Sequence, residues 1–444
     1  MKKASGKKAF VLAGGGSRGA YQIGAWQALR EIGYDFSIVT GTSVGALNGA
    51  MIVQGDFEKA KWLWENITLE QVLDIVLPKD FKKLDEKEQI QVLLKTAIKS
   101  GGAGFESLKK LLTKCLDEQA VRSSKIELGI VTVKIPGYTP CTLFRSEIPK
   151  GQLIDYLLAS SACFPAMKSY SIEGNSYIDG GYFDNLPIEM AQKHGASEVF
   201  AVDMDSIGLR RRYDKKKSKV HVLHPREDLG FFLKFDPQLS KRNIRYGYYD
   251  TMKYFGKLDG IRYTFRKGEV TKNYQVLRPI AAQLSKKLGI YLDGKPQNPL
   301  EKIARFSALK MLRKHQKGTL SDRDVFVCAL EFCAQIFSLD SNKLYRMDEM
   351  HSQIKTSFEA AYRIFDHKLE QIFYASKENK NAADIIRKQV SNIDQKTLIC
   401  LSYSLLKEVV SNRKNQMLFW HALCCIPTEC LCALYLWLIF GQNS

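Results

Sequence analysis

The chain contains 444 residues, more than one hydrophobic core usually accommodates, so its length predicts a large domain and at least one further unit. Lys and Arg outnumber Asp and Glu by 66 to 47, and the net charge of +19 favours an anionic partner such as a membrane surface, nucleic acid or an acidic protein. The ten cysteines form no evenly spaced pairs, which argues against a disulfide framework and favours a reducing cytoplasm. The apolar stretch at residues 9–13 is too short for the core of a signal peptide, so export by that route is not expected.

The N-terminal part of the chain alternates between short strands and helices. An apolar run at residues 9–13 is bounded by glycines, and apolar residues at helical spacing follow over residues 20–32. A second strand is predicted at 37–40, and a helix of small residues at 46–54 ends before Gly55. The order strand, helix, strand, helix predicts a mainly parallel sheet with helices on both faces, which is a three-layer α/β/α fold.

The same pattern continues to about residue 223 and is then replaced by helices. Further strands are predicted at 127–133, 142–144, 176–179, 199–202 and 220–223, with helices at 153–161 and 188–194. Residues 56–116 are predicted to be helical, with a glycine-rich break at 101–104. From about residue 300 only the helical period remains. We therefore expect an α/β domain over 1–285 and an all-helical C-terminal domain over 286–444.

A glycine-rich loop, Gly-Gly-Gly-Ser-Arg-Gly at residues 14–19, lies between the first strand and the first helix. Glycines at this place let the backbone turn tightly and direct amide N–H groups at one point near a helix N-terminus, which suits an anion. The spacing also satisfies G-x-G-x-x-G, so a dinucleotide-binding loop is an alternative. That alternative requires an acidic residue at the end of the second strand, but this strand ends in Thr40, and Asp35 precedes it.

A second motif, Gly-Thr-Ser-Val-Gly at residues 41–45, follows the second strand and precedes a helix. This is G-x-S-x-G in the context of a nucleophile elbow, where a strained turn presents the serine hydroxyl at the carboxyl edge of the sheet. The amide of Val44 and those of the glycine-rich loop could then bind the oxyanion of a tetrahedral intermediate. The structural alternative is that Ser43 caps the helix between two packing glycines.

A nucleophilic serine requires a base. Asp179 ends a predicted strand and precedes Gly-Gly, so we expect it at the same sheet edge as Ser43, although an aspartate that opens a Gly-Gly turn is also an ordinary structural feature. A triad that ends at His221 or His224 stays possible, because a base in such sites is usually histidine. His194 precedes Gly195 and suits the end of a helix.

These three motifs together resemble the patatin-like phospholipase family, including its bacterial members. The family combines a glycine-rich G-G-G-x-R/K-G loop, a G-x-S-x-G serine and a later D-G-G or D-G-A/G aspartate, and all three occur here in that order. Residues 159–162 with Pro165, and residues 184–187, also look like the family's surroundings of the aspartate. The resemblance covers residues 8–205 well and continues more weakly to about residue 266.

The resemblance implies a patatin-like hydrolase fold and a Ser-Asp dyad without a catalytic histidine. Ser43 would be the nucleophile and Asp179 the base, and the reaction would pass through an acyl-enzyme that water hydrolyses. Gly15, Gly16 and Arg18 would form the oxyanion loop through backbone N–H groups, with Arg18 orienting the loop. No metal or cofactor is required, and the expected activities are those of a phospholipase A, a lysophospholipase or a general lipid acyl hydrolase.

The C-terminal residues 417–440 are mostly apolar and long enough to span a bilayer as one helix. Pro427 and Glu429 fall near the middle, which favours two shorter helices. A buried core, interfacial insertion and a membrane anchor all stay open. The four cysteines of this segment, Cys424, Cys425, Cys430 and Cys432, lack the spacing of a zinc site.

The expected partners are a phospholipid or other lipid ester and a membrane surface, with no nucleic acid, since the helical region carries no recognisable nucleic-acid-binding motif. We expect a cytoplasmic protein or one attached peripherally to membranes through its C-terminal region. Two other functions stay open: a dinucleotide-binding protein that uses the glycine-rich loop, and a membrane-associated interaction protein whose hydrolase site is inactive. The sequence does not indicate the oligomeric state or the head-group preference.

Overall fold

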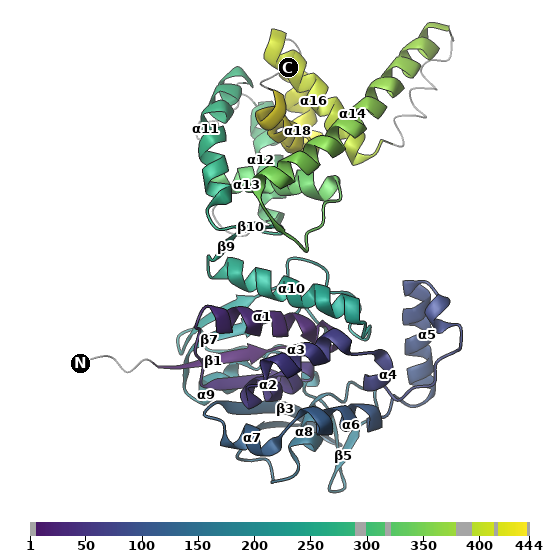
Figure 1. Cartoon of the computed structure of the whole chain (residues 1–444), viewed down its shortest axis with the longest axis vertical. Helices are drawn as coiled ribbons and strands as arrows, with labels where there is room; N and C mark the ends of the chain where they lie inside the picture. Colours follow the sequence, from purple (N-terminus) through teal and green to yellow (C-terminus); the bar gives the residue numbers. More distant parts are fainter. Residues whose placement is uncertain (1–5, 289–298, 316–320, 379–392, 413–415, 442–444) are drawn as a thin grey trace, which may run out of the picture. The chain divides into compact units, whose positions relative to one another are not determined.

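The computed structural model describes residues 6–288, 299–315, 321–378, 393–412 and 416–441. The chain divides into two compact units, Met1–Phe255 and Gly256–Ser444 (Figure 1). The division lies earlier than the expected boundary at 285–286, which falls inside helix α11 (Glu269–Leu288). Val270 and Leu277 of α11 pack into the core of the second unit, so the whole helix belongs to that unit.

The first unit contains all the strands that the sequence predicts, with bounds that agree within three residues. The strands are β1 (Lys7–Leu12), β2 (Ile38–Thr42), β3 (Glu127–Ile135), β4 (Thr139–Phe144), β5 (Tyr170–Ile172), β6 (Asn175–Asp179), β7 (Ala196–Val202) and β8 (Lys219–Leu223). The helices are η1 (Gly16–Gly19), α1 (Ala20–Glu31), α2 (Val44–Gln54), α3 (Phe57–Asn66), α4 (Leu69–Val72), η2 (Phe81–Lys83), α5 (Glu86–Lys99), α6 (Glu106–Cys115), α7 (Glu118–Ser123), α8 (Leu153–Ser160), η3 (Gly180–Tyr182), α9 (Ile188–Lys193) and α10 (Pro237–Tyr254).

One sheet of eight strands organises this unit. Strands β3, β2, β1, β7 and β8 are parallel neighbours in that order, and β4, β5 and β6 add antiparallel pairs at the β3 end. The connections between the parallel strands carry helices, as parallel pairing requires. The predicted mainly parallel sheet is confirmed.

Side chains alternate between the two faces of the parallel strands, as the period of a strand dictates. Phe10, Leu12 and Phe200 belong to the larger core, which also includes residues of α1, α2, α3 and α6. Val11 and Ala201, which point to the other face, pack with Ile188 and Ala191 of α9. The sheet is thus covered on both faces, which confirms the predicted three layers.

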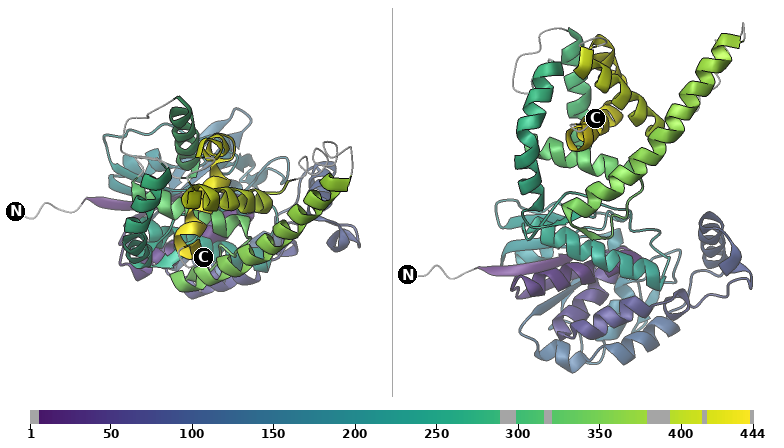
Figure 2. Two further views of the ribbon diagram at one scale, coloured as in Figure 1. Left: turned by 90° about the horizontal axis from the view of Figure 1, so that it is seen from above. Right: turned by 45° about the horizontal axis from the view of Figure 1, so that its top comes forward.

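The second unit is mainly helical. Its helices are α11, α12 (Pro299–His315), α13 (Asp322–Ile336), α14 (Met347–Glu378), α16 (Gln395–Asn412), α17 (Gln416–Cys425) and α18 (Pro427–Phe440). Figure 2 shows α14 extending past the other helices of its unit. A small sheet formed by β9 (Leu258–Asp259), β10 (Thr264–Arg266) and β11 (Leu344–Tyr345) was not predicted, because strands of two or three residues leave no periodic signal.

The apolar C-terminal segment forms two helices, α17 and α18, which meet at Ile426 and Pro427. Phe419, Trp420 and Leu436 are almost fully buried, as are Cys430 and Cys432. These side chains belong to the two hydrophobic cores of the helical unit. Over the described part of the chain, no helix is both long enough and apolar enough to cross a membrane.

Candidate active site

Ser43 occupies a strained turn between β2 and α2. Its φ of 56° lies in the left-handed region, which costs energy for any residue with a side chain. The flanking glycines permit the turn: a Cβ on Gly41 would lie 2.2 Å from the carbonyl oxygen of Gly45, and one on Gly45 would lie 2.3 Å from that of Leu12. Ser43 is therefore held by close backbone packing and not by a helix-capping role, since its side chain caps no helix amide.

The backbone amide of Ser43 is held by a second serine, Ser160 at the end of α8. The Ser160 hydroxyl accepts a hydrogen bond from the Ser43 amide at 2.9 Å and donates one to the Val131 carbonyl of β3 at 2.7 Å. Ser160 is fully buried. Its role was missed from the sequence, where residues 159–162 stood out through family resemblance alone.

Asp179 is the last residue of β6, and β6 lies along the same side of β3 as β2. Thr42, the last residue of β2, is paired with Val131, and Asp179 is paired with the next residue, Thr132. Strand β4 pairs with the opposite side of β3 over these same residues. The carboxyl ends of β2 and β6 therefore meet end to end, and Ser43 follows directly after this junction.

The sequence analysis expected Asp179 at the same sheet edge as Ser43 because it ends a strand. That strand, β6, is antiparallel to β3 and approaches from beyond the carboxyl edge. The two ends can meet because β3 continues past Val131 to Ile135 and provides backbone with which β6 pairs.

Asp179 is buried, and its carboxyl has few partners. Its Oδ1 accepts a hydrogen bond from the Gly181 amide at 2.7 Å. Burial raises the pKa of Asp179 to about 6, while hydrogen bonding from the Ser43 side chain and the Gly181 amide lowers it in part. A carboxyl with this pKa is ionised at neutral pH and still basic enough to accept a proton from a hydroxyl.

Three backbone amides near Ser43, those of Gly15, Gly16 and Val44, have no hydrogen-bond acceptor among the described residues. Gly16 and Val44 begin helices, so the helix geometry leaves their N–H groups without an internal partner. All three residues line one cavity with Ser43, where their amides are available to a negative oxygen.

Arg18 contributes to this loop through its side chain and not through its amide. Its amide donates to the carbonyl of Gly15 at 3.2 Å and is therefore occupied inside the turn. Its guanidinium donates to the Gly230 carbonyl at 2.9 Å and to the carbonyls of Met204 and Asp205 at 3.4 Å. The Arg18 amide is therefore not free to bind an oxyanion, although this was expected. The contacts of the Arg18 side chain fit the expected role of orienting the loop.

A buried polar network supports the other side of the glycine-rich loop. The Gln22 amide donates to the carbonyl of Ala13 at 2.7 Å, and the Asn48 amide donates to Gly19 at 3.0 Å and to Gln22 at 2.8 Å. Trp64 completes the network by donating to Asn48 at 2.9 Å. Gln22 and Asn48 were not singled out in the sequence, because an amide on a helix face has no distinctive spacing.

Ser43 and Asp179 open into an apolar cavity of about 560 Å³, a size typical of ligand-binding pockets. Much of its apolar wall comes from the segment α2–α4 and from α6, through Leu47, Met51, Leu63, Trp64, Ile67, Val72, Leu73, Leu108, Leu111 and Leu112. Cys163 also lines the cavity, but burial and the Asp179 carboxylate raise the pKa of its thiol to about 12. At neutral pH this thiol stays protonated, which makes it a poor nucleophile.

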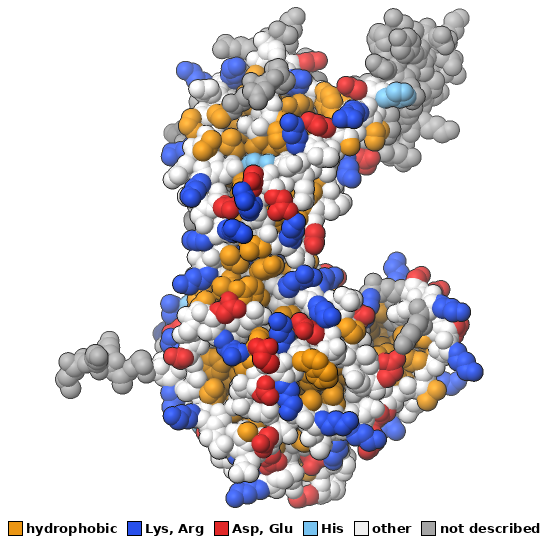
Figure 3. Space-filling view, viewed as in Figure 1, with side chains coloured by type: hydrophobic (Ala, Val, Ile, Leu, Met, Phe, Trp, Pro, Cys, Tyr) orange, Lys and Arg blue, Asp and Glu red, His pale blue; other side chains and the backbone are white. Residues whose placement is uncertain are grey.

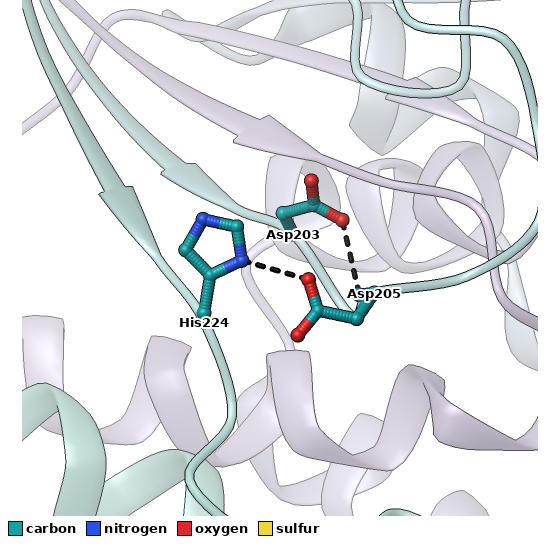
Figure 4. Close-up of side chains that lie close together, drawn as sticks. All are labelled: Asp203, Asp205 and His224. Carbon is teal, nitrogen blue, oxygen red and sulfur yellow. Dashed lines mark hydrogen bonds and ion pairs between the residues drawn. The ribbon is translucent and has the colours of Figure 1, made fainter. Parts of the chain in front are cut away.

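No described histidine lines this cavity. His221 interacts with the hydroxyl of Tyr254, and His194 stacks on Phe144. His224 interacts through Nδ1 with Asp205 at 2.8 Å, next to Asp203 (Figure 4). Both carboxylate oxygens of Asp203 accept hydrogen bonds from Arg210, so the carboxylate is already paired with a cation. These contacts leave the alternative triad without a histidine that faces Ser43.

Comparison with known proteins adds an independent observation. Residues 10–191 match the model of the patatin-like phospholipase family. Mouse patatin-like phospholipase domain-containing protein 7 is 28% identical over 210 residues, which are 45% of this chain and 14% of that protein. Lysophospholipase NTE1 of Mycosarcoma maydis is 29% identical over 200 residues, 45% of this chain and 10% of that protein.

The match covers less than half of this chain and a small part of each relative. The chain spans about a seventh or less of the length of these curated relatives. The crystal structure of VipD from Legionella pneumophila aligns with 99% of this chain and 92% of that chain, at 14% sequence identity and a TM-score of 0.37, which is too low to inform the site. The glycine-rich loop, the serine elbow and Asp179 all fall inside residues 10–191, the region of this chain that matches the patatin-like phospholipase family.

Proposed function

We propose that the chain is a lipid acyl hydrolase in which Ser43 is the nucleophile and Asp179 is the general base. The observation that carries the proposal is the shared cavity: a strained serine and a buried carboxyl lie on the wall of one apolar pocket, beside amides that have no other acceptor. An apolar wall suits a fatty acyl chain, and the polar end suits its ester group. The lysophospholipase relatives support the same substrate class.

In the first half of the reaction, the Ser43 hydroxyl attacks the ester carbonyl carbon and its proton passes to Asp179. The carbonyl oxygen becomes negative and accepts hydrogen bonds from the amides of Gly15, Gly16 and Val44. The intermediate collapses as the ester C–O bond breaks, and the leaving alcohol takes the proton from Asp179. Ser43 is left as an acyl ester, and the alcohol product departs.

In the second half, Asp179 takes a proton from a water molecule, which attacks the acyl ester. The same amides stabilise the second tetrahedral intermediate. Collapse returns the proton to Ser43 and releases the fatty acid. Atoms and charges balance without a metal or cofactor, because one carboxyl carries the proton in both halves.

The test is incubation with defined phospholipids and lysophospholipids, followed by identification of the fatty acids released. Ser43→Ala and Asp179→Asn should each lower the rate at least about 10³-fold, because the nucleophile or its base is removed. Thermal unfolding of both variants should stay cooperative, which excludes loss of the fold as the cause. Activity close to wild type in either variant would overturn the assignment.

The inactive-interaction alternative predicts a different result. A fluorophosphonate probe reacts with serines that a base activates. It should label the wild-type chain at Ser43 and leave Ser43→Ala unlabelled. A wild-type chain that resists the probe and releases no fatty acid would favour a binding protein with a silent hydrolase site. For the dinucleotide alternative, a titration with NAD or NADP that shows no binding removes it.

We further propose that this chain meets its substrate at a membrane surface, because long acyl chains avoid water and gather in bilayers.

A further inference from the structure

Large apolar side chains are exposed at the mouth of the cavity. Ile207 is 95% exposed, Leu209 is 62% exposed and Tyr182 is 39% exposed, although all three also line the cavity. In a water-soluble surface such side chains are usually scattered singly. Here they continue the apolar wall of the pocket outward to the surface.

These residues form one continuous rim. The amide of Leu209 donates to the carbonyl of Gly181 at 2.8 Å, which places residues 207–209 beside Tyr182. The hydroxyl of Tyr182 donates to the carbonyl of Phe164, whose ring is half exposed. We call Phe164, Tyr182, Ile207 and Leu209 the mouth rim.

We propose that the mouth rim inserts into the interfacial layer of a phospholipid bilayer, so that a lipid passes from the bilayer into the cavity. This inference rests on the proposed function, because it assigns the surface that delivers a lipid ester to Ser43. Tyrosine and phenylalanine, with aliphatic residues beside them, suit the boundary between head groups and acyl chains. An acyl chain that moves along this surface stays in contact with apolar groups and avoids water.

The bilayer contact assigned here differs from the one that the sequence suggested. The C-terminal segment 417–440 was a candidate for interfacial insertion, but its described apolar side chains largely face the cores of the helical unit. The mouth rim, in contrast, is exposed in the unit that holds Ser43.

Positive charge does not single out the mouth rim. Lys and Arg side chains are spread over both units in the view of Figure 3. In the basic run 210–217, Arg210 and Arg211 follow the rim directly and are paired with Asp203 and Glu189, while Lys215 to Lys217 lie just before β8 begins. Because β7 and β8 are parallel, these lysines lie at the opposite edge of the sheet from Ser43. The rim therefore docks through apolar contact, and its binding should persist at high salt.

The experiment measures flotation of the full chain with dioleoyl-phosphatidylcholine vesicles in 0.5 M NaCl, in a Ser43→Ala background. Zwitterionic lipid and high salt suppress the general attraction from the net charge of +19. Replacing Ile207 and Leu209 together by serine should lower the partition coefficient about tenfold or more, since two exposed apolar side chains no longer enter the lipid. The matched control, Val276→Ser with Phe306→Ser, changes two equally exposed apolar residues of the helical unit and should leave flotation unchanged.

A second arm separates this inference from the proposed function. Phe164→Ser alters the rim at an exposed residue that does not line the cavity. In the active chain it should lower hydrolysis of vesicle phospholipid several-fold and leave hydrolysis of soluble p-nitrophenyl butyrate unchanged. A Ser43→Ala chain with an intact rim that fails to float, or rim and control variants that float alike, would overturn the inference. A chain that floats through the rim but hydrolyses neither substrate would overturn the proposed function and support the rim.

Discussion

Two apolar regions of this protein are built from similar side chains and behave differently. The cavity beside Ser43 is surrounded by leucine, isoleucine and methionine, yet it stays open at about 560 Å³. The helices α17 and α18 are even richer in apolar residues, and their described inward side chains are closed against neighbouring helices. The comparison shows that a strongly hydrophobic segment is usually buried against its neighbours. A binding site forms instead where a strained backbone turn and a buried carboxyl lie beside a cavity that side chains do not fill.

The largest expected effect concerns the closed region. Leu436→Ala should lower the free energy of unfolding by about 2–5 kcal/mol, because Leu436 is fully buried and the truncation leaves a cavity. Leu111→Ala, on the cavity wall of the first unit, should cost less than about 1 kcal/mol, since Leu111 already faces open space. Urea denaturation measures both. Equal costs would show that the two regions are packed alike.

Asp179→Asn should stabilise the fold at high pH. The pKa of Asp179 is raised from an ordinary 3.8 to about 6, so the folded state disfavours the ionised carboxyl. This cost is absent below pH 4, grows between pH 4 and pH 6, and is complete above pH 6. The asparagine variant should therefore gain up to about 3 kcal/mol at pH 8 and almost nothing at pH 4. Denaturation at the two pH values tests this, and a gain at pH 4 as large as that at pH 8 would contradict it.

The pH dependence of hydrolysis should follow the same carboxyl. Because Asp179 acts as a base when ionised, kcat/KM should be about tenfold lower at pH 5 than at pH 8, with a midpoint near pH 6 and a plateau above about pH 7. Asp184 provides a matched control: burial raises its pKa to about 6 as well, but it does not line the cavity. Asp184→Asn should leave the midpoint near pH 6. If the midpoint is lost in Asp184→Asn, the titration belongs to Asp184 and the assignment to Asp179 is wrong.

The smallest effect is expected in the network beneath the glycine-rich loop. Gln22→Leu removes the hydrogen bond to Ala13 and leaves Asn48 without one acceptor, so the loop amides should shift slightly. We expect kcat to fall several-fold with KM little changed. Gln27→Leu on the same helix is the control, since Gln27 bonds only to the exposed side chain of Glu31 among described residues. If the two variants behave alike, the network does not position the loop.

Much of the fold follows from local patterns in the sequence. The strands of the parallel sheet and the helices α1 and α2 were predictable because apolar periodicity and glycines mark their ends. Helix α10 was missed, although Asp236 caps its first turn and Pro237 opens it, because its interior is rich in tyrosine and basic residues. Its contact with α1 is a property of the folded unit and has no local signature.

The candidate site was predictable as a set of residues and not as a geometry. Gly15, Gly16, Ser43, Val44 and Asp179 line one cavity, as the motifs indicated. Motif spacing does not predict the direction of β6 or the hydrogen bond from the Ser43 amide to Ser160, because both join segments far apart in the sequence. It also does not show that the Arg18 amide is already bonded to Gly15, which depends on the conformation of the loop.

Strands β2 and β6 meet end to end on β3. For this reason the distance between Ser43 and Asp179 can change only in discrete steps. Side chains alternate along a strand, so β6 can slide only by two residues at a time if Asp179 is to keep its face, which is a displacement of about 7 Å. Side-chain changes around the junction can therefore accumulate gradually, whereas a one-residue insertion or deletion within β6 would turn Asp179 to the opposite face of the sheet in one event. Length variation within β6, more than its composition, is what natural or laboratory evolution of this protein would have to avoid.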